Sequence, residues 1–512
     1  MSDSKQLKRY IMLVIMISIM FGVISLMAYT FDDLFMYRHW EDILNGNLFR
    51  KTDFMTVHNS MPFLHQKWAM CFLTYLIYNI GGFFGWSIAA MILRIGCYIF
   101  LGIILYKLNP KYLYPNIYIF TISLFLDGQD ATFRPQIIST ALVILEVYLL
   151  EQFSKSRIGK IKLWVSLFVI SLFMMWFHST MWLLSVITII PYLVHIKWSK
   201  FEEQTYNLID VWIGLGFILL ASLFQPNGIY QYKYMLLCAT GIENGFSGSV
   251  GELKSFSITD GASLLFLFVA VMFAYTYFVC TKGKKKNIHH ILLVGGYFIL
   301  AFKSIRMSAL ASIIAGLMLS AELSRSEEEV VDFAFVKANI LASIKKYIGS
   351  IILITFGIVF VSFLVLKGAY ITFNPEYNHS YASKYYAKSF IPISTKEYDL
   401  AGKKVWSPLT DDSTILEFDG AIMYFDCRAE LFSGFNYETD IHEEVYDTIS
   451  VIANGDYNDV LKEWSFLQNK YDFDYYIIMK EMTKEVPNTL SIEEIADRVY
   501  ENNVVILYKV RK

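Results

Sequence analysis

The chain has 512 residues, 55% of them hydrophobic and 17% aromatic, with a formal net charge of −2. Only 18% of the residues are charged, whereas soluble domains have about a quarter. A near-neutral charge argues against a nucleic-acid partner, and five scattered cysteines without a CxxC pair argue against zinc or a disulfide framework. Apolar runs recur through residues 11–367, while 375–512 has the composition of soluble protein. These features predict an integral membrane protein with a soluble C-terminal domain.

Eleven apolar runs are candidate membrane-spanning helices. They cover 11–29, 84–106, 112–126, 136–153, 161–177, 181–196, 207–224, 262–280, 288–303, 306–321 and 348–367. Several are shorter than the roughly 20 residues that cross about 30 Å of hydrocarbon, so their bounds are approximate. The predicted fold class is a membrane all-α bundle of about eleven spanning helices followed by an α/β domain.

Basic residues are concentrated in alternate loops between these runs. The richer loops hold Lys107 and Lys111, then Lys155, Arg157, Lys160 and Lys162, then Lys197 and Lys200, then Lys282 and Lys284–Lys286, and last Arg325, Lys337, Lys345 and Lys346. Cytoplasmic loops of membrane proteins carry such an excess of lysine and arginine. The pattern predicts a plasma-membrane protein with a cytoplasmic N-terminus and an extracytoplasmic C-terminal domain.

Two long outer segments interrupt the predicted bundle of residues 1–370. The first outer loop, 30–83, contains an apolar stretch over 68–80 that is too short to span and ends at Gly81–Gly82. We expect this stretch to be a helix lying in the membrane plane, because counting it as a span would put the lysine clusters outside. The second long outer segment is 225–261.

The C-terminal domain, residues 371–512, has the alternation of an α/β protein. Strand-like runs occur at 421–425, 475–479 and 504–510, and helical patterns cover about 440–470 and 491–501.

Polar residues that are costly at membrane depth gather on the predicted outer side. They are Asp32, Asp33, Asp53, His58 and His65 in the first loop, Asp130 and Arg134 in the second, His178 after 161–177, Glu252 in 225–261, and Lys303 and Arg306 in a tight turn. Ionisable groups so placed usually line a cavity. The arginines and the lysine suit a phosphate or diphosphate, while Asp53, His58, His65, Asp130, His178 and Glu252 would line the cleft or contact an acceptor.

Each of these residues also has a simpler structural interpretation. Asp32 and Asp33 follow the first span directly, where carboxylates are often solvated, and Arg134 before Pro135 is typical of an interfacial anchor. His178 is more often a packed interfacial residue than a chemical one. Either aspartate could instead ligate Mg²⁺ or Mn²⁺; no metal site follows from the spacing, and no other cofactor is indicated.

The first loop, read as a unit, resembles that of bacterial GT-C glycosyltransferases, polytopic enzymes that use polyprenyl-phosphate sugars. The likeness rests on Asp32–Asp33 just after the first span, Gly46, and the stretch Arg50-Lys-Thr-Asp53-Phe-Met-Thr56. Phe133–Gln136, Gln225–Gly228 and Glu252 are similar to later motifs, and Asp426-Cys427-Arg428 is similar to an Asp-Gly-Arg of the C-terminal domain. Met36 stands where many relatives carry a histidine, and Cys427 replaces the usual glycine.

The resemblance implies an inverting sugar transfer from a polyprenyl-phosphate-linked donor to a glycan, lipid or protein acceptor at the outer face. Asp33, or else Asp32, would be the general base, and Arg134 and Arg306 would face the lipid-linked phosphate. Two other functions stay open: a transporter of lipid-linked glycan or polysaccharide, and a non-catalytic envelope assembly protein with this fold.

Overall fold

The chain divides into two compact units. A computed structural model describes residues 2–23, 25, 31–63, 66–124, 126, 133–196, 198–221, 223–232, 235, 255–326, 398, 400–408, 410–426, 428, 441–480, 487–502 and 504–512. The first unit, called the helical unit here, comprises the described residues within 1–27, 87–229 and 242–368. The second, called the mixed unit, comprises those within 28–86, 230–241 and 369–512, so the first predicted loop groups with the C-terminal residues.

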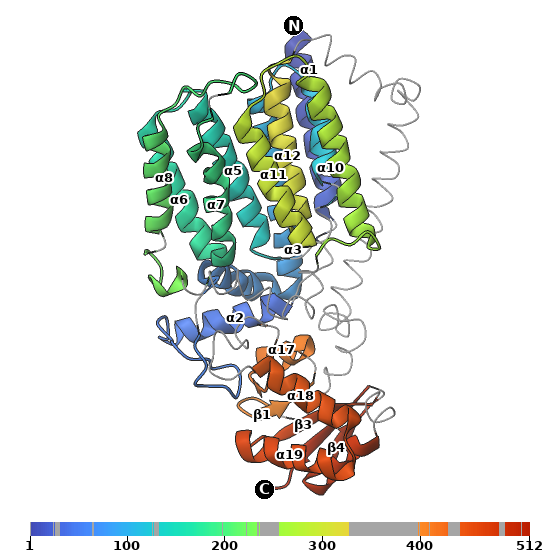
Figure 1. Ribbon diagram of the computed structural model, residues 1–512. Coiled ribbons are helices and arrows are strands. Elements are labelled where there is room, and N and C mark those ends of the chain that lie inside the picture. Colours follow the sequence, from blue (N-terminus) through green and yellow to red (C-terminus); the bar gives the residue numbers. More distant parts are fainter. Residues whose placement is uncertain are drawn as a thin grey trace. The chain divides into compact units, whose positions relative to one another are not determined.

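The helical unit is a bundle of apolar helices (Figure 1). In chain order these are α1 (Ser2–Gly22), the second part of α3 (Trp68–Leu108), α4 (Leu113–Leu124), α5 (Gln136–Ser154), α6 (Lys160–His178), α7 (Leu183–Ile189), α8 (Leu208–Ala221), α10 (Gly261–Cys280), α11 (Ile288–Lys303) and α12 (Ser308–Leu323). Short 3₁₀ turns η3 (Ser179–Trp182), η4 (Ile190–Leu193) and η7 (Ile305–Met307) flank α7 and precede α12.

Most of the predicted spans coincide with these helices. Among the described residues, five helical stretches are long and apolar enough to cross a membrane: 68–108, 136–154, 160–193, 261–280 and 305–323. Three shorter apolar helices cover 113–124, 208–221 and 288–303. The predicted span 348–367 lies outside the described residues, and 181–196 contains only a two-turn α-helix because Pro191 opens a 3₁₀ turn there.

Polar side chains start several of the helices. Asp260 accepts a hydrogen bond from the Ser263 amide at 2.8 Å before α10, and Asn287 accepts one from the His289 amide at 2.9 Å before α11. Such caps satisfy amides that a helix leaves without partners.

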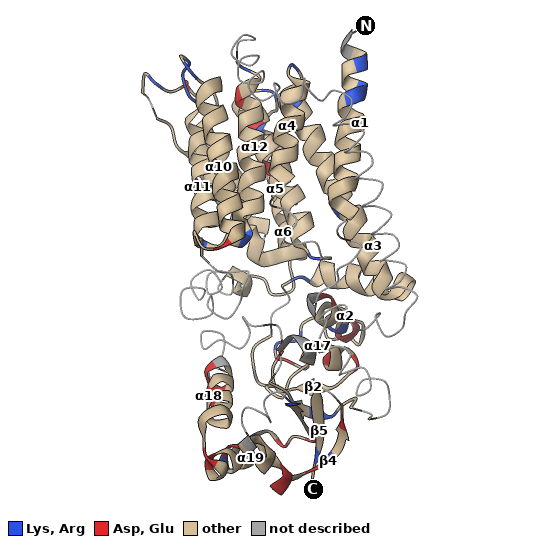
Figure 2. Cartoon of the chain, turned by 90° about the vertical axis from the view of Figure 1, so that its right-hand side faces the viewer, with Lys and Arg blue, Asp and Glu red and all other residues tan. Residues whose placement is uncertain are grey.

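The described parts of the predicted basic loops lie together at one end of the helical unit. Lys284 Nζ donates to the Arg325 carbonyl at 2.6 Å, the Lys286 amide donates to the Lys200 carbonyl at 3.1 Å, and Ser326 Oγ donates to the Cys280 carbonyl at 2.9 Å. Figure 2 shows lysines and arginines in these loops at the same end of the bundle as the start of α1. Arg306 lies before α12 and Arg325 after it, so η7 is at the opposite end. The side of the membrane that each end faces stays a prediction.

Helix α3 is broken at Gly82, where the in-plane stretch was expected to end. Gly82 has φ 59° and ψ −151°, a conformation that side chains with a Cβ rarely adopt. The helical stretch before Gly82 exposes Phe72, Leu76 and Ile80 at four-residue spacing, which forms an apolar stripe.

The mixed unit is built on a five-stranded sheet with strand order β2-β1-β3-β5-β4. The strands are β1 (Lys404–Trp406), β2 (Ile422–Met423), β3 (Tyr475–Met479), β4 (Ala496–Glu501) and β5 (Val505–Val510), accompanied by α2 (Phe31–Leu44), α17 (Thr410–Phe418), α18 (Ile441–Asn454), α19 (Tyr457–Tyr471) and η10 (Pro487–Glu494). β1 pairs in parallel with β2 and β3, while β5 pairs antiparallel with β3 and β4.

Most of the predicted C-terminal elements are confirmed. All three predicted strands are present, and the helical pattern of 440–470 corresponds to two helices, with Asp456 capping the second. The helix predicted over 491–501 is wrong: η10 occupies its beginning, and 496–501 is the edge strand β4. Pairing with the buried strand β5 overrode the helical pattern of that segment.

The core of the mixed unit draws on both ends of its sequence. Trp406, Trp464 and Tyr476 pack together with Met61 and Phe63, which come from the first predicted loop. The loop is therefore part of a hydrophobic core rather than an independent excursion.

Candidate active site

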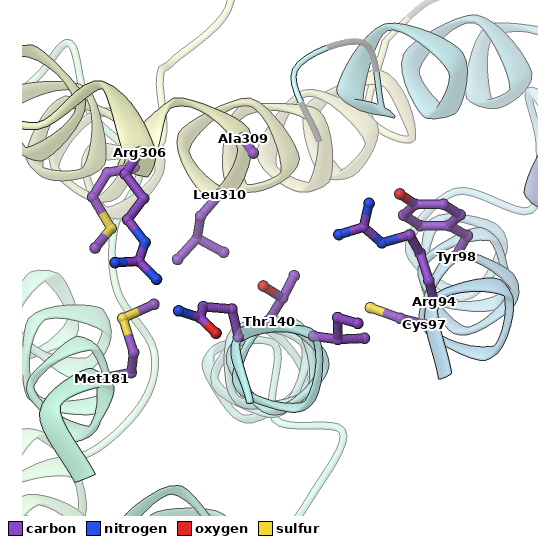
Figure 3. A pocket seen from close by; sticks show the side chains of 11 residues that line it. Arg94, Cys97, Tyr98, Thr140, Met181, Arg306, Ala309 and Leu310 are labelled. Carbon is purple, nitrogen blue, oxygen red and sulfur yellow. The ribbon is translucent and has the colours of Figure 1, made fainter. Parts of the chain in front are cut away.

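A cavity of about 40 Å³ lies in the helical unit, at the end away from the basic loops. It is large enough for about three water molecules or a comparably small polar group. The residues around it are Arg94, Cys97, Tyr98, Gln136, Ile137, Thr140, Met181, Arg306, Met307, Ala309 and Leu310. Figure 3 shows the guanidinium groups of Arg306 and Arg94 on opposite sides, with Thr140 and Leu310 between them.

Several elements bring these side chains together. Arg94 projects from the middle of the spanning part of α3, Gln136 is the first residue of α5, and Arg306 is held in the 3₁₀ turn that leads into α12. Helices α5 and α12 therefore both begin close to the cavity, and a helix N-terminus carries partial positive charge. Two arginines and two helix N-termini favour a small anionic group, such as a phosphate.

The other predicted residues of the helical unit lie near the same end. Arg134 directly precedes Pro135 and α5, and Lys303 is the last residue of α11. The buried His178 ends α6, where its Nδ1 is 3.3 Å from Ser139 Oγ. Asp130 and Glu252 fall outside the described residues.

Asp33 belongs to the mixed unit, in the third position of α2, and its side chain is fully buried. Helix α2 packs against α17. Around this packing lies an aromatic group in which Phe418 of α17 contacts Tyr37 at 5.1 Å and Tyr78 at 5.3 Å between ring centroids. The neighbouring Asp32 is also in α2, but its side chain lies outside the described part.

Asp53 and Arg428, far apart in the sequence, form a buried ion pair in the mixed unit. Arg428 Nη1 donates to Asp53 Oδ1 at 2.7 Å, and Arg428 Nε donates to Asp426 Oδ2 at 2.9 Å. Asp53 Oδ2 accepts from the Thr56 amide at 2.9 Å and from Thr56 Oγ1 at 2.6 Å. Burial opposes ionisation of Asp53, but Arg428 and Thr56 hold its pKa below the usual value.

A further buried carboxyl group, Glu417, lies beside this pair. Burial, together with the negative charge of Asp426, raises the pKa of Glu417 well above its usual value. Arg428 therefore faces two carboxylates, Asp53 and Asp426, while burial favours the neutral form of Glu417.

His58 is also buried and donates from Nε2 to the Tyr424 carbonyl at 2.8 Å. Burial lowers the pKa of His58 to about 4, although that hydrogen bond and the charge of Glu444 oppose the shift. A neutral histidine so enclosed is a core residue of the mixed unit. His65 falls outside the described residues.

Several important residues were missed in the sequence. Arg94 lies inside the predicted span 84–106, where a charged residue is itself a signal of function. The same signal marks a buried network at the basic end: His290 Nε2 is 2.9 Å from Glu151 Oε1, and His290 Nδ1 is 2.7 Å from Glu322 Oε1. Glu417 gave no signal, because an acid in a soluble domain is ordinarily exposed.

Within the part of the chain that the structure describes, no three His, Cys, Asp or Glu side chains are placed to hold a metal ion. Binding of Mg²⁺ or Mn²⁺ by Asp32 or Asp33 stays a prediction.

The whole chain is similar in structure to known membrane transferases. The Archaeoglobus fulgidus oligosaccharyltransferase, tethered with an acceptor peptide containing the NVT sequon, matches with a TM-score of 0.52 and 12% identity, over 99% of this chain and 74% of that one. ArnT from Cupriavidus metallidurans in the apo state matches with a TM-score of 0.51 and 11% identity, over 98% of both chains. No protein-family model and no curated protein matches the sequence.

The chain has the GT-C fold. Its apolar helices and this fold together identify it as an integral membrane protein. At these levels of identity the similarity concerns the fold, as the sequence resemblance predicted, and the chemistry must be argued from the residues.

Proposed function

We propose that the protein is an inverting membrane glycosyltransferase. It would move a sugar from a polyprenyl-phosphate-linked donor to an acceptor at the outer face of the membrane. The observation that carries the proposal is the cavity lined by Arg94 and Arg306 within a GT-C fold. The cavity lies at the end of the helical unit away from the basic loops, which is the outer end by the positive-inside pattern.

The reaction is a direct displacement at the anomeric carbon. The acceptor hydroxyl gives its proton to a carboxylate, assigned to Asp33, while its oxygen attacks that carbon. The bond from the carbon to the phosphate oxygen breaks, and the lipid phosphate leaves with the electron pair. Arg94 and Arg306 stabilise the charge that develops on the phosphate. The lipid keeps the donor in the bilayer, so no nucleotide is needed.

The assignment of the base can be tested with two adjacent substitutions. Asp33→Asn and Asp32→Asn are assayed in membranes for transfer from labelled polyprenyl-phosphate sugars. We expect Asp33→Asn to lower the rate about 10²–10⁴-fold, as loss of a general base does, while Asp32→Asn stays near the parent rate. Loss only in Asp32→Asn would move the role to Asp32, and parent rates in both variants would refute a first-loop base.

A transporter of lipid-linked glycan is the second candidate. It is favoured by the buried Glu151–His290–Glu322 network, because ionisable groups within membrane helices often mark transport pathways. Flux of lipid-linked substrate across vesicles without any sugar transfer would support it. If the protein shows neither flux nor sugar transfer, the result would support a non-catalytic assembly protein.

A further inference from the structure

The first-loop segment 51–63 is bound to the edge of the sheet of the mixed unit through an isolated parallel bridge between Thr56 and Met423. The Val57 amide donates to the Met423 carbonyl at 2.9 Å, and the Met423 amide donates to the Met55 carbonyl at 3.0 Å. Thr56 pairs in parallel with Met423, and β2 is the outermost strand of the sheet on this side. The segment therefore covers an edge that would otherwise be open.

Arg428 fixes this segment from the C-terminal side. Its side chain is 3% exposed, and that of Asp53 is 0% exposed. Asp426 accepts hydrogen bonds from the Arg428 amide at 2.7 Å and from Arg428 Nε. The guanidinium therefore binds Asp426, two positions earlier in the chain, as well as Asp53. Removal of the arginine would leave Asp53 as a buried charge without its counter-charge.

Two contact paths lead from this ion pair to helix α2. In the first, the Arg428 guanidinium lies 5.9 Å from the ring centroid of Phe63, and Phe63 meets the His39 ring edge-on at 4.9 Å. In the second, Arg50, three residues before Asp53, donates from Nη2 to Asp42 Oδ1 at 2.7 Å. His39 and Asp42 are both in α2.

Helix α2 also carries Asp33, six residues before His39 and therefore less than two turns away. On another side, α17 of the C-terminal part packs against α2. The C-terminal domain thus holds the helix with the proposed base through α17 and through the segment that Arg428 fixes.

Resting on the proposed function, we propose that Arg428 is a positioning residue for sugar transfer: by binding Asp53 it fixes segment 51–63, and through it the place of α2 and Asp33. Arg428 itself need touch neither donor nor acceptor. The C-terminal domain then has a catalytic purpose beyond binding an acceptor, because it completes the support of the base.

The test uses the full-length protein in lipid nanodiscs with four variants. Arg428→Met removes the positive charge of the ion pair. Asp53→Asn removes the negative charge with little change in side-chain volume, which guards against a folding defect. Arg428→Lys keeps the charge but not the forked donor. The matched control, Arg498→Gln, removes an arginine of the same domain whose ion pairs with Glu493 and Glu501 are exposed.

Two readouts are taken from each variant. Trypsin cleavage after Arg50 or Lys51 reports whether the segment is held, and kcat and KM for labelled polyprenyl-phosphate sugar report transfer. We expect Arg428→Met and Asp53→Asn to speed cleavage about tenfold or more and to lower kcat about tenfold, with KM for the donor within about twofold. The cleavage rate and kcat of Arg428→Lys should lie between those of the parent and of Arg428→Met. Both values for Arg498→Gln should match those of the parent.

The proposal is overturned if cleavage stays at the parent rate in both Arg428→Met and Asp53→Asn. It is equally overturned if cleavage accelerates while kcat is unchanged, since the segment would then have no influence on Asp33. A parent protein that transfers no sugar would refute the proposed function and the positioning role together, and the trypsin pattern would still decide whether Arg428 fixes the segment.

Discussion

Each unit contains a buried arginine, Arg428 in the mixed unit and Arg94 in the helical unit, but their settings differ. In the mixed unit, Arg428 forms ion pairs with Asp53 and Asp426. Burial opposes the charge of Arg428, but these carboxylates outweigh it and raise the pKa of Arg428 well above the usual value. In the helical unit, Arg94 and Arg306 border a cavity near the start of two helices. Burial alone therefore does not reveal what an arginine does.

What surrounds each arginine makes the difference. A guanidinium saturated by carboxylates of the protein contributes to structure, because its donors are already used. Arg94 and Arg306 instead line a cavity, where a guanidinium can contact a ligand. Under the proposed function, Arg428 holds the fold and Arg94 and Arg306 bind the donor phosphate. Substitutions at both kinds of arginine test this proposal.

Among the tests of this comparison, the largest effect is expected at Arg94. Replacing it by Gln removes a positive charge from the proposed phosphate site, so transfer should fall about 10²–10³-fold, as when one preorganised donor is lost from a transition-state site. The measurement is the rate of transfer from labelled polyprenyl-phosphate sugar. Arg157→Gln, in an exposed loop of the same unit, is the control and should leave the rate unchanged. An active Arg94→Gln variant would contradict the phosphate site.

The second expected effect is a dependence of stability on pH in the mixed unit. His58 has a pKa of about 4 in the folded protein, below its ordinary 6.5, so the unfolded chain binds an extra proton between these values. The contribution of His58 to the free energy of unfolding is therefore complete above about pH 6.5. It is lost as the pH falls towards 4, by up to about 3 kcal/mol.

The measurement compares the parent with His58→Gln, which can still donate to the Tyr424 carbonyl. Fluorescence of the buried Trp406 and Trp464 follows denaturation in detergent at several pH values. The raised pKa of Glu417 acts in the opposite direction, so only the difference between the two proteins isolates His58. A difference that does not change between pH 7 and pH 4.5 would show that His58 is not enclosed as described.

A smaller effect is expected where α3 changes direction. Gly82→Ala places a Cβ at φ +59°, which should cost about 1–3 kcal/mol or force the break to move. Gly81→Ala is the matched control, since Gly81 lacks a positive φ and a Cβ there meets no neighbour within 4 Å. Thermal denaturation of both variants in detergent provides the measurement. Equal melting temperatures would mean that the break does not depend on Gly82.

The smallest effect is expected at Arg498, the exposed counterpart of Arg428. Its side chain is 43% exposed and pairs with Glu493 and Glu501 at the sheet edge. Exposed ion pairs contribute about 0–1 kcal/mol, so Arg498→Gln should barely change the free energy of unfolding. A loss as large as that of Arg428→Met, measured by the same fluorescence, would remove the distinction between enclosed and exposed arginines.

Local patterns in the sequence predicted much of the fold. Apolar runs predicted helices such as 261–280 and 136–154, the buried run 475–479 predicted β3, and Gly81–Gly82 marked the break in α3. These features follow from the hydrophobicity or backbone freedom of neighbouring residues, which the sequence displays directly.

The partners of the charged residues were decided only by the tertiary structure. Arg428 and Asp53 are separated by 375 positions, and Arg94 joins Arg306 at the cavity although it lies in a different predicted span. Segment 496–501 likewise became a strand by pairing with β5. The sequence by itself determined which segments are apolar and where the chain turns. Which charges meet depends on how distant elements pack, and no local preference encodes that.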